Sequence, residues 1–501
     1  MHRIKKIMPR LSLAALACSA AATLALIFIA PILEDRPLFV AGWLVAVTLL
    51  WLAGVACLDY HGLPEAGDSD FAAPGRGPLA LILAAFVLAA FVFAPVYFSD
   101  DSVRHIHDGF YLLQGVDVYT TPPKSLPPFL DRLPNHPDVG TIYLPFTQLQ
   151  AVVGAALHPR YGFLAVYYSV IFALLGLVWS RLRFGRERSI ALAFIFSPAF
   201  LIPLAARHAD VQGLLLVAAA VALLRTGDHA ESQTNHDDAR PPGLRRDGIF
   251  GRHALAAGLL ALAAGLKPEG LLWAGTVGLY VFVLCVNDSF SPARRRGLYG
   301  FIVGGAVTGG GLALFAWMVL FPTPDAWQSF MRTVALFTDW FAAYNPILHA
   351  RETLYPDVER PALLGIYRRE VLLLALLWFL LPMHRFLRGV HGQAGAAQFL
   401  IGRLLVALLT ASILSKGVWH PWYFLWLLPA LWLTGRRRGA MFLAGALPLF
   451  YLPVIFLRAT GEWWMPVFYG GVLAYAALFF VWWICAYKFF TNPAEKLRSV
   501  F

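Results

Sequence analysis

Residues 79–98 read LALILAAFVLAAFVFAPVYF, and Ser99, Asp100 and Asp101 follow directly. The run has no charged side chain, and it has the length of about 20 residues that a helix needs to cross a hydrocarbon core of about 30 Å. Two earlier runs, Leu11–Leu33 and Leu38–Leu58, have the same character. We therefore expect an all-α protein that crosses a membrane several times.

The rest of the chain is equally apolar. Of its 501 residues, 59% are hydrophobic and 14% are charged, and the mean hydropathy is +0.64. Long apolar runs predict about 12–14 membrane spans, which we assign to a single transmembrane domain over residues 1–501. The further candidate spans are 161–181, 189–206, 211–225, 253–266, 270–286, 298–321, 370–386, 398–415, 420–434, 440–457 and 465–487.

The first apolar run follows the basic segment 2–10, so a cleaved signal peptide is an alternative, with small residues around Cys18–Ala22 as its cleavage site. The apolar part of a signal peptide is typically 7–15 residues long. Since this run is longer and a second run follows almost at once, we expect an uncleaved first helix.

The orientation of the chain depends on the segment 143–157. It is apolar but opens with Tyr143, Pro145 and Gln148, so we place it on or partly in the outer interface. The alternative, a further span, would invert everything downstream. With the interfacial assignment, 25 of the 40 Lys and Arg residues lie inside, as the positive-inside rule expects.

This topology indicates an integral protein of the cytoplasmic membrane whose net charge of +11 mostly reflects orientation. Basic clusters such as Arg294–Arg296 fall inside and need no nucleic-acid partner, although they could contact anionic lipids. The cysteines lie in spans or at the end of one, so no external disulfide framework is expected. The polar segment 226–252 is predicted to be a mobile cytoplasmic loop.

The outer face receives segments that are far apart in the chain. They are the loops 99–142 and 322–369 and the turns Arg207–Asp210, Lys267–Glu269 and 416–422. Carboxylates, histidines and aromatic residues from these segments converge on one side of the membrane, whereas the inner loops offer dispersed charge. This asymmetry predicts a site that faces outward.

The densest polar signal begins with Asp100 and Asp101 at the end of the third run. An ionised Asp within a span costs about 2.5–3.5 kcal/mol, so adjacent carboxylates at its edge suggest a function. The alternative is that one of them caps the next helix. A metal site built from His105, His107 and Asp108 is disfavoured, because no Cys or Glu-x-x-His pattern accompanies them. We expect neither a metal nor another cofactor.

Several motifs in the first external loop resemble those of a known family. They are Asp100-Asp101 followed by Arg104 and Asp108-Gly109, then Gly115 with Tyr119, then Asn135-His136-Pro137-Asp138 leading through Thr141-Ile142-Tyr143 and Pro145 to Gln148. This pattern is similar to the first large external loop of bacterial GT-C glycosyltransferases. The resemblance is to the branch of polyprenol-phosphate-mannose-dependent mannosyltransferases.

Later segments match the same family in order. They are Ser197-Pro198, Arg207-His208-Ala209-Asp210, Gly265-Leu266-Lys267-Pro268 and His420-Pro421-Trp422-Tyr423-Phe424-Leu425-Trp426. Together with the first loop they span residues 99 to 434. The departures from the family pattern are Ser197 and Ala209, each in place of Asn, and Leu144 in place of Pro. They leave the GT-C-type fold assignment intact and put the identity of the donor in doubt.

The resemblance implies an inverting membrane glycosyltransferase that moves a sugar, mannose by analogy, from a polyprenyl-phosphate donor to a glycan or lipid acceptor. Its general base would be Asp100 or Asp101. The substrate-binding residues that it implies are Arg104, His136, Tyr143, Arg207, His208, Asp210, Lys267, His420, Trp422 and Tyr423. Arg104, Arg207, His208 and Lys267 would stabilise the leaving phosphate, and the aromatic residues near His420 would orient the sugar.

Each of these assignments has a plainer alternative. Lys267 could be a turn residue that snorkels to the interface, Arg207 and His208 an ordinary interfacial turn, and the aromatic residues near His420 part of an aromatic belt. The rival functions are a transporter or lipid flippase, and a membrane assembly protein without turnover. A transporter would place its ionisable residues near the middle of the membrane rather than at one face.

Overall fold

The computed structural model describes residues 2–61, 98–131, 133–182, 191, 193–233, 242–287, 292–342, 345–380, 393–416, 420–433, 440, 443–444 and 447–460. Every regular element within these ranges is helical, and none of these residues lies in a strand. The all-α part of the predicted fold class is therefore confirmed for the described residues.

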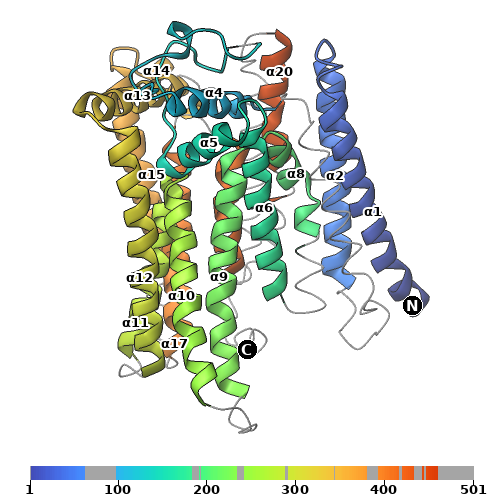
Figure 1. Cartoon of the computed structure of the whole chain (residues 1–501). Helices are drawn as coiled ribbons and strands as arrows, with labels where there is room; N and C mark the ends of the chain where they lie inside the picture. The colour runs from blue at the N-terminus through green and yellow to red at the C-terminus, as the bar shows by residue number, and fades with distance from the viewer. Residues whose placement is uncertain are drawn as a thin grey trace.

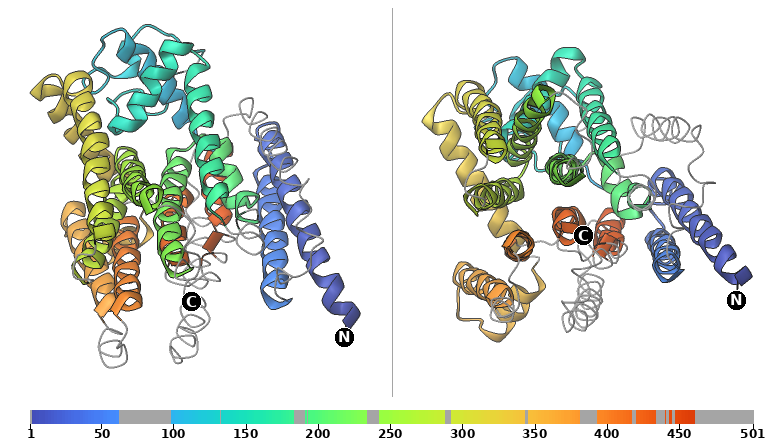
Figure 2. Two further views of the ribbon diagram at one scale, coloured as in Figure 1. Left: turned by 60° about the horizontal axis from the view of Figure 1, so that its bottom comes forward. Right: turned by 90° about the horizontal axis from the view of Figure 1, so that it is seen from below.

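Long helices lie side by side and form the body of the protein (Figure 1). They are α1 (His2–Ile29), α2 (Pro37–His61), α6 (Gly162–Arg181), α9 (Ala209–Gln233), α10 (Pro242–Ala264), α11 (Pro268–Asn287), α12 (Pro292–Phe315), α15 (Arg360–Leu380) and α17 (Gln393–Leu414). The pair α1 and α2 stands at one side, α10 to α12 pack against one another toward the opposite side, and α9 lies between them and packs on α10 (Figures 1 and 2).

A second layer of shorter helices covers one end of this body (Figure 1). It contains α4 (Asp101–Leu113), the short helix η2 (Pro123–Ser125), α5 (Pro145–Leu157), α13 (Pro324–Ala342) and α14 (Pro346–Leu354). A separate apolar cluster, which includes Tyr111, Tyr119 and Phe330, joins α4, the following loop and α13. The two external loops predicted from the sequence therefore lie at the same end of the protein.

Two described helices are long and apolar enough to cross a membrane by length and composition. They are Gly162–Arg181 and Arg294–Leu320, the second of which includes most of α12 and the π-helical segment η3 (Ala316–Leu320). Core helices of soluble proteins can pass the same test. This finding alone therefore does not establish a protein with many spans.

The chain departs from regular α-helix in three predicted spans. Within 189–206 the structure describes α8 (Pro198–Ala205), which begins at the N-cap Ser197. The region 420–434 opens as the 3₁₀ segment η4 (Pro421–Trp426) before α18 (Leu427–Leu433), and 440–457 contains η5 (Leu447–Tyr451) and α20 (Leu452–Thr460). Proline explains two of these starting points, because Pro198 and Pro421 are the first residues of α8 and η4. Proline lacks a backbone N–H donor and is best tolerated at the start of a helix.

The predicted loop 226–252 is also more regular than expected. α9 continues to Gln233 and α10 begins at Pro242, so only residues 234–241 of the loop lie outside the described residues. Good helix formers such as Ala230 and Glu231 account for the extension of α9. The predicted spans 79–98 and 465–487 lie outside the described residues, except for Phe98.

Candidate active site at one end of the helices

Helix α4 carries the first group of candidate residues and lies against α5. Its buried face includes Arg104, His105 and Asp108. The close approach of the two helices requires Gly109, because a Cβ atom there would lie 2.2 Å from the carbonyl oxygen of Ala151. Gly109 thus allows the polar face of α4 to pack closely against α5.

The two adjacent carboxylates at the start of α4 have different partners. Asp100 occupies the N-cap position but makes no side-chain capping hydrogen bond, and its Oδ2 lies 3.5 Å from Nη2 of Arg458 on α20. Asp101 accepts a hydrogen bond from Asn135 over 2.8 Å, and its Oδ2 lies 3.1 Å from Nε2 of His208. The capping alternative for Asp100 is not supported by this geometry.

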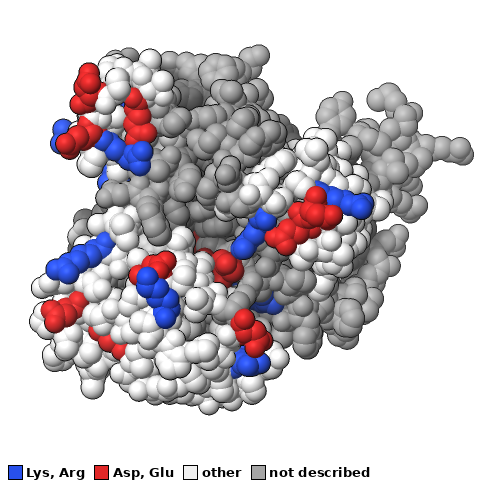
Figure 3. Space-filling model, turned by 90° about the horizontal axis from the view of Figure 1, so that it is seen from above, with Lys and Arg blue, Asp and Glu red and all other residues white. Residues whose placement is uncertain are grey.

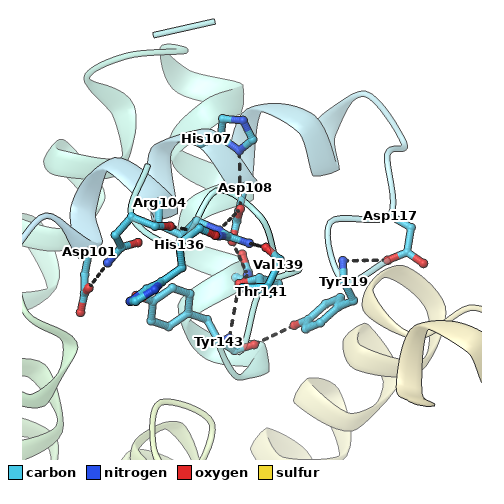
Figure 4. Close-up of polar contacts among 12 residues, drawn as sticks. Asp101, Arg104, His107, Asp108, Asp117, Tyr119, His136, Val139, Thr141 and Tyr143 are labelled. Atoms are coloured by element: carbon cyan, nitrogen blue, oxygen red, sulfur yellow. Dashed lines mark hydrogen bonds and ion pairs between the residues drawn. The ribbon is translucent and has the colours of Figure 1, made fainter. Parts of the chain in front are cut away.

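Arg104 is buried and binds the protein itself. Its Nε donates to Asp108 over 2.9 Å, and its terminal nitrogens donate to the backbone carbonyls of Asn135, His136 and Val139 (Figure 4). With 4% of the residue exposed, the guanidinium group is occupied in holding the loop 135–139 against α4. The predicted role of Arg104 in binding a phosphate group does not agree with these contacts.

Asp108 completes the attachment of this loop. Its second carboxylate oxygen accepts from the Gln148 amide over 3.2 Å, and the same amide donates to Thr141 over 3.1 Å. Burial raises the pKa of Asp108, but the nearby Arg104 charge and its hydrogen bonds outweigh this and lower the pKa below the usual value. Asp108 is therefore an ionised structural partner of Arg104.

His136 and Tyr143 form part of the wall around Asp101. His136 has a positive φ of 48°, and its ring contacts Phe337 of α13 with centroids 4.7 Å apart. The Tyr143 ring packs edge to face on His105 at 4.1 Å, and its backbone carbonyl accepts from the Tyr119 hydroxyl over 2.7 Å (Figure 4). Burial is the main reason that the pKa of His105 falls to about 4, so this ring is neutral.

A tight turn between α8 and α9 brings the second group of residues to the same place. Arg207 has a φ of 56°, in the left-handed region, and is 4% exposed. Tyr167 on α6 donates to the carbonyl of His208 over 2.9 Å. Since the Arg207 side chain is buried, the structure offers it little access to a substrate.

His208 lies between two carboxylates. Its Nε2 is 3.1 Å from Oδ2 of Asp101, and its Nδ1 is 2.7 Å from Oδ2 of Asp210. Both separations suit hydrogen bonds, but neither is ideally aligned, so we describe them as ion pairs. Asp210, which is fully buried, also accepts a hydrogen bond from the Trp426 indole over 2.5 Å and lies 3.9 Å from Nζ of Lys267.

The third group comes from the segment 416–426. Trp422 stacks between His208 and His420, with ring centroids 4.2 and 4.3 Å away. Lys416 places its Nζ 3.7 Å from the centroid of the Tyr423 ring, and Lys267 lies 5.8 Å from the same centroid. These distances place two partly exposed cations and an aromatic wall beside the carboxylate cluster.

Most predicted site residues are therefore brought together, and several partners were missed. Asn135 and Trp426 lie inside the motifs quoted above, and Lys416 and Glu269 lie in the predicted outer turns 416–422 and Lys267–Glu269, so all four had a sequence signal. Glu269 pairs with Lys416 at 2.6 Å, whereas Arg458, which faces Asp100, lies in no motif and in no predicted outer turn. Their contacts depend on packing between distant helices.

Seen from this end, acidic and basic side chains lie in several groups on the described surface (Figure 3). Within the residues that the structure describes, no group of three or more His, Cys, Asp or Glu is arranged to hold a metal ion. Comparisons with protein-family models, with curated proteins and with solved structures find nothing that matches this chain.

Proposed function

We propose that this protein is an inverting glycosyltransferase of the cytoplasmic membrane. It transfers a sugar, mannose by analogy with the family it resembles, from a polyprenyl-phosphate donor to a glycan or lipid acceptor at the outer face. The observation that carries the proposal is Asp101: its carboxylate is oriented by Asn135 and His208 and keeps 21% of its side chain exposed. A fixed, ionised and accessible carboxylate is what a general base requires.

The exposed apolar surface supports the membrane part of the proposal. On α12 and η3, Val307 is 70% exposed and Trp317 is 71% exposed, and on α15 Leu374 is 65% exposed. Val307 and Leu374 lie along helices of the body, and Trp317 lies where α12 continues into η3. Water would disfavour such a surface, whereas lipid tails would cover it at no cost.

The reaction that we propose needs one base and one leaving group. Asp101 takes the proton from an acceptor hydroxyl, and that oxygen attacks the anomeric carbon of the donor sugar. The bond from this carbon to the phosphate oxygen breaks, and its electron pair leaves with the polyprenyl phosphate. Lys267 and Lys416, which keep 18% and 26% of their side chains exposed, are the cations placed to stabilise that phosphate.

Burial and charge favour this assignment of roles. Burial alone would lower the pKa of Lys267, but Asp210 and other nearby groups raise it above its ordinary value, so the ammonium group stays charged. The aromatic side chains of Trp422 and Tyr423 lie next to the cations and suit the apolar face of a sugar ring. Asp100 fits the role of base less well, since it faces Arg458.

The rival reading as a transporter finds less support. The charge cluster lies at one end of the helices, whereas a transporter would place ionisable groups near the middle. Arg403 is a charge within α17, but its guanidinium packs 4.4 Å from the centroid of Trp378 and donates to the carbonyl of that residue. This contact explains Arg403 as a structural residue.

The test uses the purified full chain in detergent with a panel of polyprenyl-phosphate sugars and a mixed glycan and lipid acceptor pool. We expect release of polyprenyl phosphate with at least one donor and transfer of its sugar, both abolished by Asp101→Asn. Absence of release with every donor would contradict the proposal. Movement of labelled lipid across vesicles without release would favour the transporter instead.

A further inference from the structure

His208 is too buried to act on a substrate directly. It is 1% exposed, and the ring is enclosed by Asp101, Asp210 and the stacked face of Trp422. Asp210 is 0% exposed and contacts His208, Trp426 and Lys267. These contacts are unlike those of a phosphate-binding group, which must present a donor to its ligand.

We propose that His208 is a positioning residue that holds Asp101 ionised and oriented, and that Asp210 is the counter-charge that keeps His208 in place. The inference deepens the proposed function and rests on it, because the role of Asp101 as a base gives its ionised state a use. It differs from the sequence-based expectation that His208 and Asp210 bind the substrate.

The known contacts of Asp101 leave hydrogen-bond acceptor positions on its carboxylate for a substrate hydroxyl. Oδ1 receives the Asn135 amide and Oδ2 faces His208, so each oxygen has one fixed partner. A carboxylate offers about four acceptor positions, and two are therefore open to an acceptor hydroxyl. Because the two partners come from different loops, neither oxygen can rotate away without breaking a contact.

Positive charges near Asp101 are needed to keep its partly buried carboxyl group ionised. Burial in a site of low polarity raises the pKa of Asp101 and favours its neutral form. The positive charges of His208, which lies 3.1 Å away, and of Lys267 reverse this effect and hold the pKa of Asp101 well below its usual range. Asp100 is the adjacent carboxylate, and its own partner is Arg458.

Asp210 has the corresponding effect on His208. Burial lowers the pKa of His208, but its contacts with Asp101 and Asp210 outweigh burial and raise it. The other ionisable groups near the imidazole are His105, Lys267, and His420 on the far face of Trp422. Trp426 and Lys267 in turn fix Asp210, so the chain of contacts runs from the helix body to the base.

The test compares the pH dependence of turnover in the wild type, His208→Gln, His208→Lys and Asp210→Asn. We expect the acid limb of the kcat profile to move to higher pH by about one unit or more in His208→Gln and Asp210→Asn. His208→Lys should retain part of the low-pH activity, because it keeps the positive charge. Gln212→Leu is the matched control. Gln212 lies on α9, as Asp210 does, and its substitution removes a buried, uncharged contact with Gln150, so the acid limb of the kcat profile should not move.

A second measurement does not depend on turnover. Infrared titration of the full chain should show a protonated-carboxyl band that Asp101→Asn removes, and this band should appear at higher pH in His208→Gln than in the wild type. If neither the band nor the acid limb moves in His208→Gln, the inference is overturned. If the band moves but no donor is ever turned over, the inference stands and the proposed function fails.

Discussion

The side-chain amide of Asn135 donates a hydrogen bond to Oδ1 of Asp101 over 2.8 Å, although 34 residues separate them. The neighbouring Asp100 has no such partner in the loop and lies 3.5 Å from Arg458. Two adjacent residues of the same type are thus placed in different chemical surroundings. They should respond differently to the same substitution.

Replacement of Asp101 by Asn should lower turnover by about 10²–10⁴-fold, because it removes the proton acceptor while keeping the size of the side chain. Donor affinity should be largely retained. Asp100→Asn should cost much less activity, since Arg458 remains partly exposed to water. Product formation and donor affinity, measured side by side on folded protein, check this, and near-normal turnover of Asp101→Asn would require another base.

Loss of Lys267 or Lys416 should weaken use of the lipid-phosphate donor. Removing one charge-assisted contact costs about 1.5–3 kcal/mol, which corresponds to a rise in the donor KM of roughly ten- to a hundredfold. Lys124→Ala serves as the control, because this lysine is in the same layer of short helices but pairs with Asp138 on the surface. Equal effects of all three alanine variants would indicate general attraction of the donor rather than a defined phosphate site.

Arg104→Met should destabilise the protein by about 3–5 kcal/mol, because it leaves Asp108 as a buried charge without its main partner. Thermal unfolding in detergent measures this change. Lys124→Met is the matched control and should alter stability by about 0–1 kcal/mol, since its ion pair is exposed. A small effect of Arg104→Met together with a large loss of donor affinity would restore the phosphate-binding role.

The ion pair of Arg104 and Asp108 also predicts how the stability of the protein changes in acid. The pKa of Asp108 is lower in the folded chain than its ordinary value of 3.8, so its contribution to stability is fully present above that value. The contribution is lost as the pH falls through the folded pKa. In unfolding measured between neutral pH and about pH 3, the loss of stability should be smaller for Asp108→Asn than for the wild type.

Gly213→Ala should disturb the site from within α9. A Cβ atom there would lie 2.2 Å from the Trp426 ring, which donates to Asp210. The ring must move, so stability and turnover should both fall. Gly275→Ala on α11 is the control, because its Cβ would meet nothing within 4 Å and alanine in a helix adds about 0.5–1 kcal/mol of stability. Unchanged turnover of Gly213→Ala would show that the indole contact is dispensable.

Single cysteine labels test the membrane orientation. Ser125 and Thr338 belong to the layer at the end that holds the site, whereas Ser232 lies near the opposite end of α9 (Figure 1). Labels at the first two positions should react with an impermeant reagent added outside intact cells, and a label at Ser232 should not. The reverse pattern would turn the proposed site toward the cytoplasm.

The sequence predicted helices best where an apolar run is bounded by residues that favour a helix end, such as proline at the first position. The expected segments 161–181 and 270–286 agree closely with α6 and α11, and α11 begins at Pro268, a residue suited to a first helical position. The interrupted helices after residue 420 were not predicted, since apolar composition does not distinguish a 3₁₀ turn from an α-helix.

The site was predicted as a set of residues but not as a set of contacts. The motifs correctly placed Asp101, His208 and Lys267 at one end of the protein, because topology decides which loops share a face. They did not reveal that Arg104 points into the loop 135–139, nor that Trp426 reaches Asp210 across 216 residues. Such pairings depend on how distant helices pack, and one sequence contains no local pattern for them.

The distance along the chain between Asp210 and Trp426 also matters while the protein is being made. At about 5–20 residues per second, the ribosome needs about 10–40 s to add the 216 residues that separate them. During that interval the carboxylate waits without its indole donor, and a chain that stops early cannot complete the site. The contacts around Asp210 are therefore completed late in synthesis, since only a chain synthesised beyond Trp426 can form this hydrogen bond.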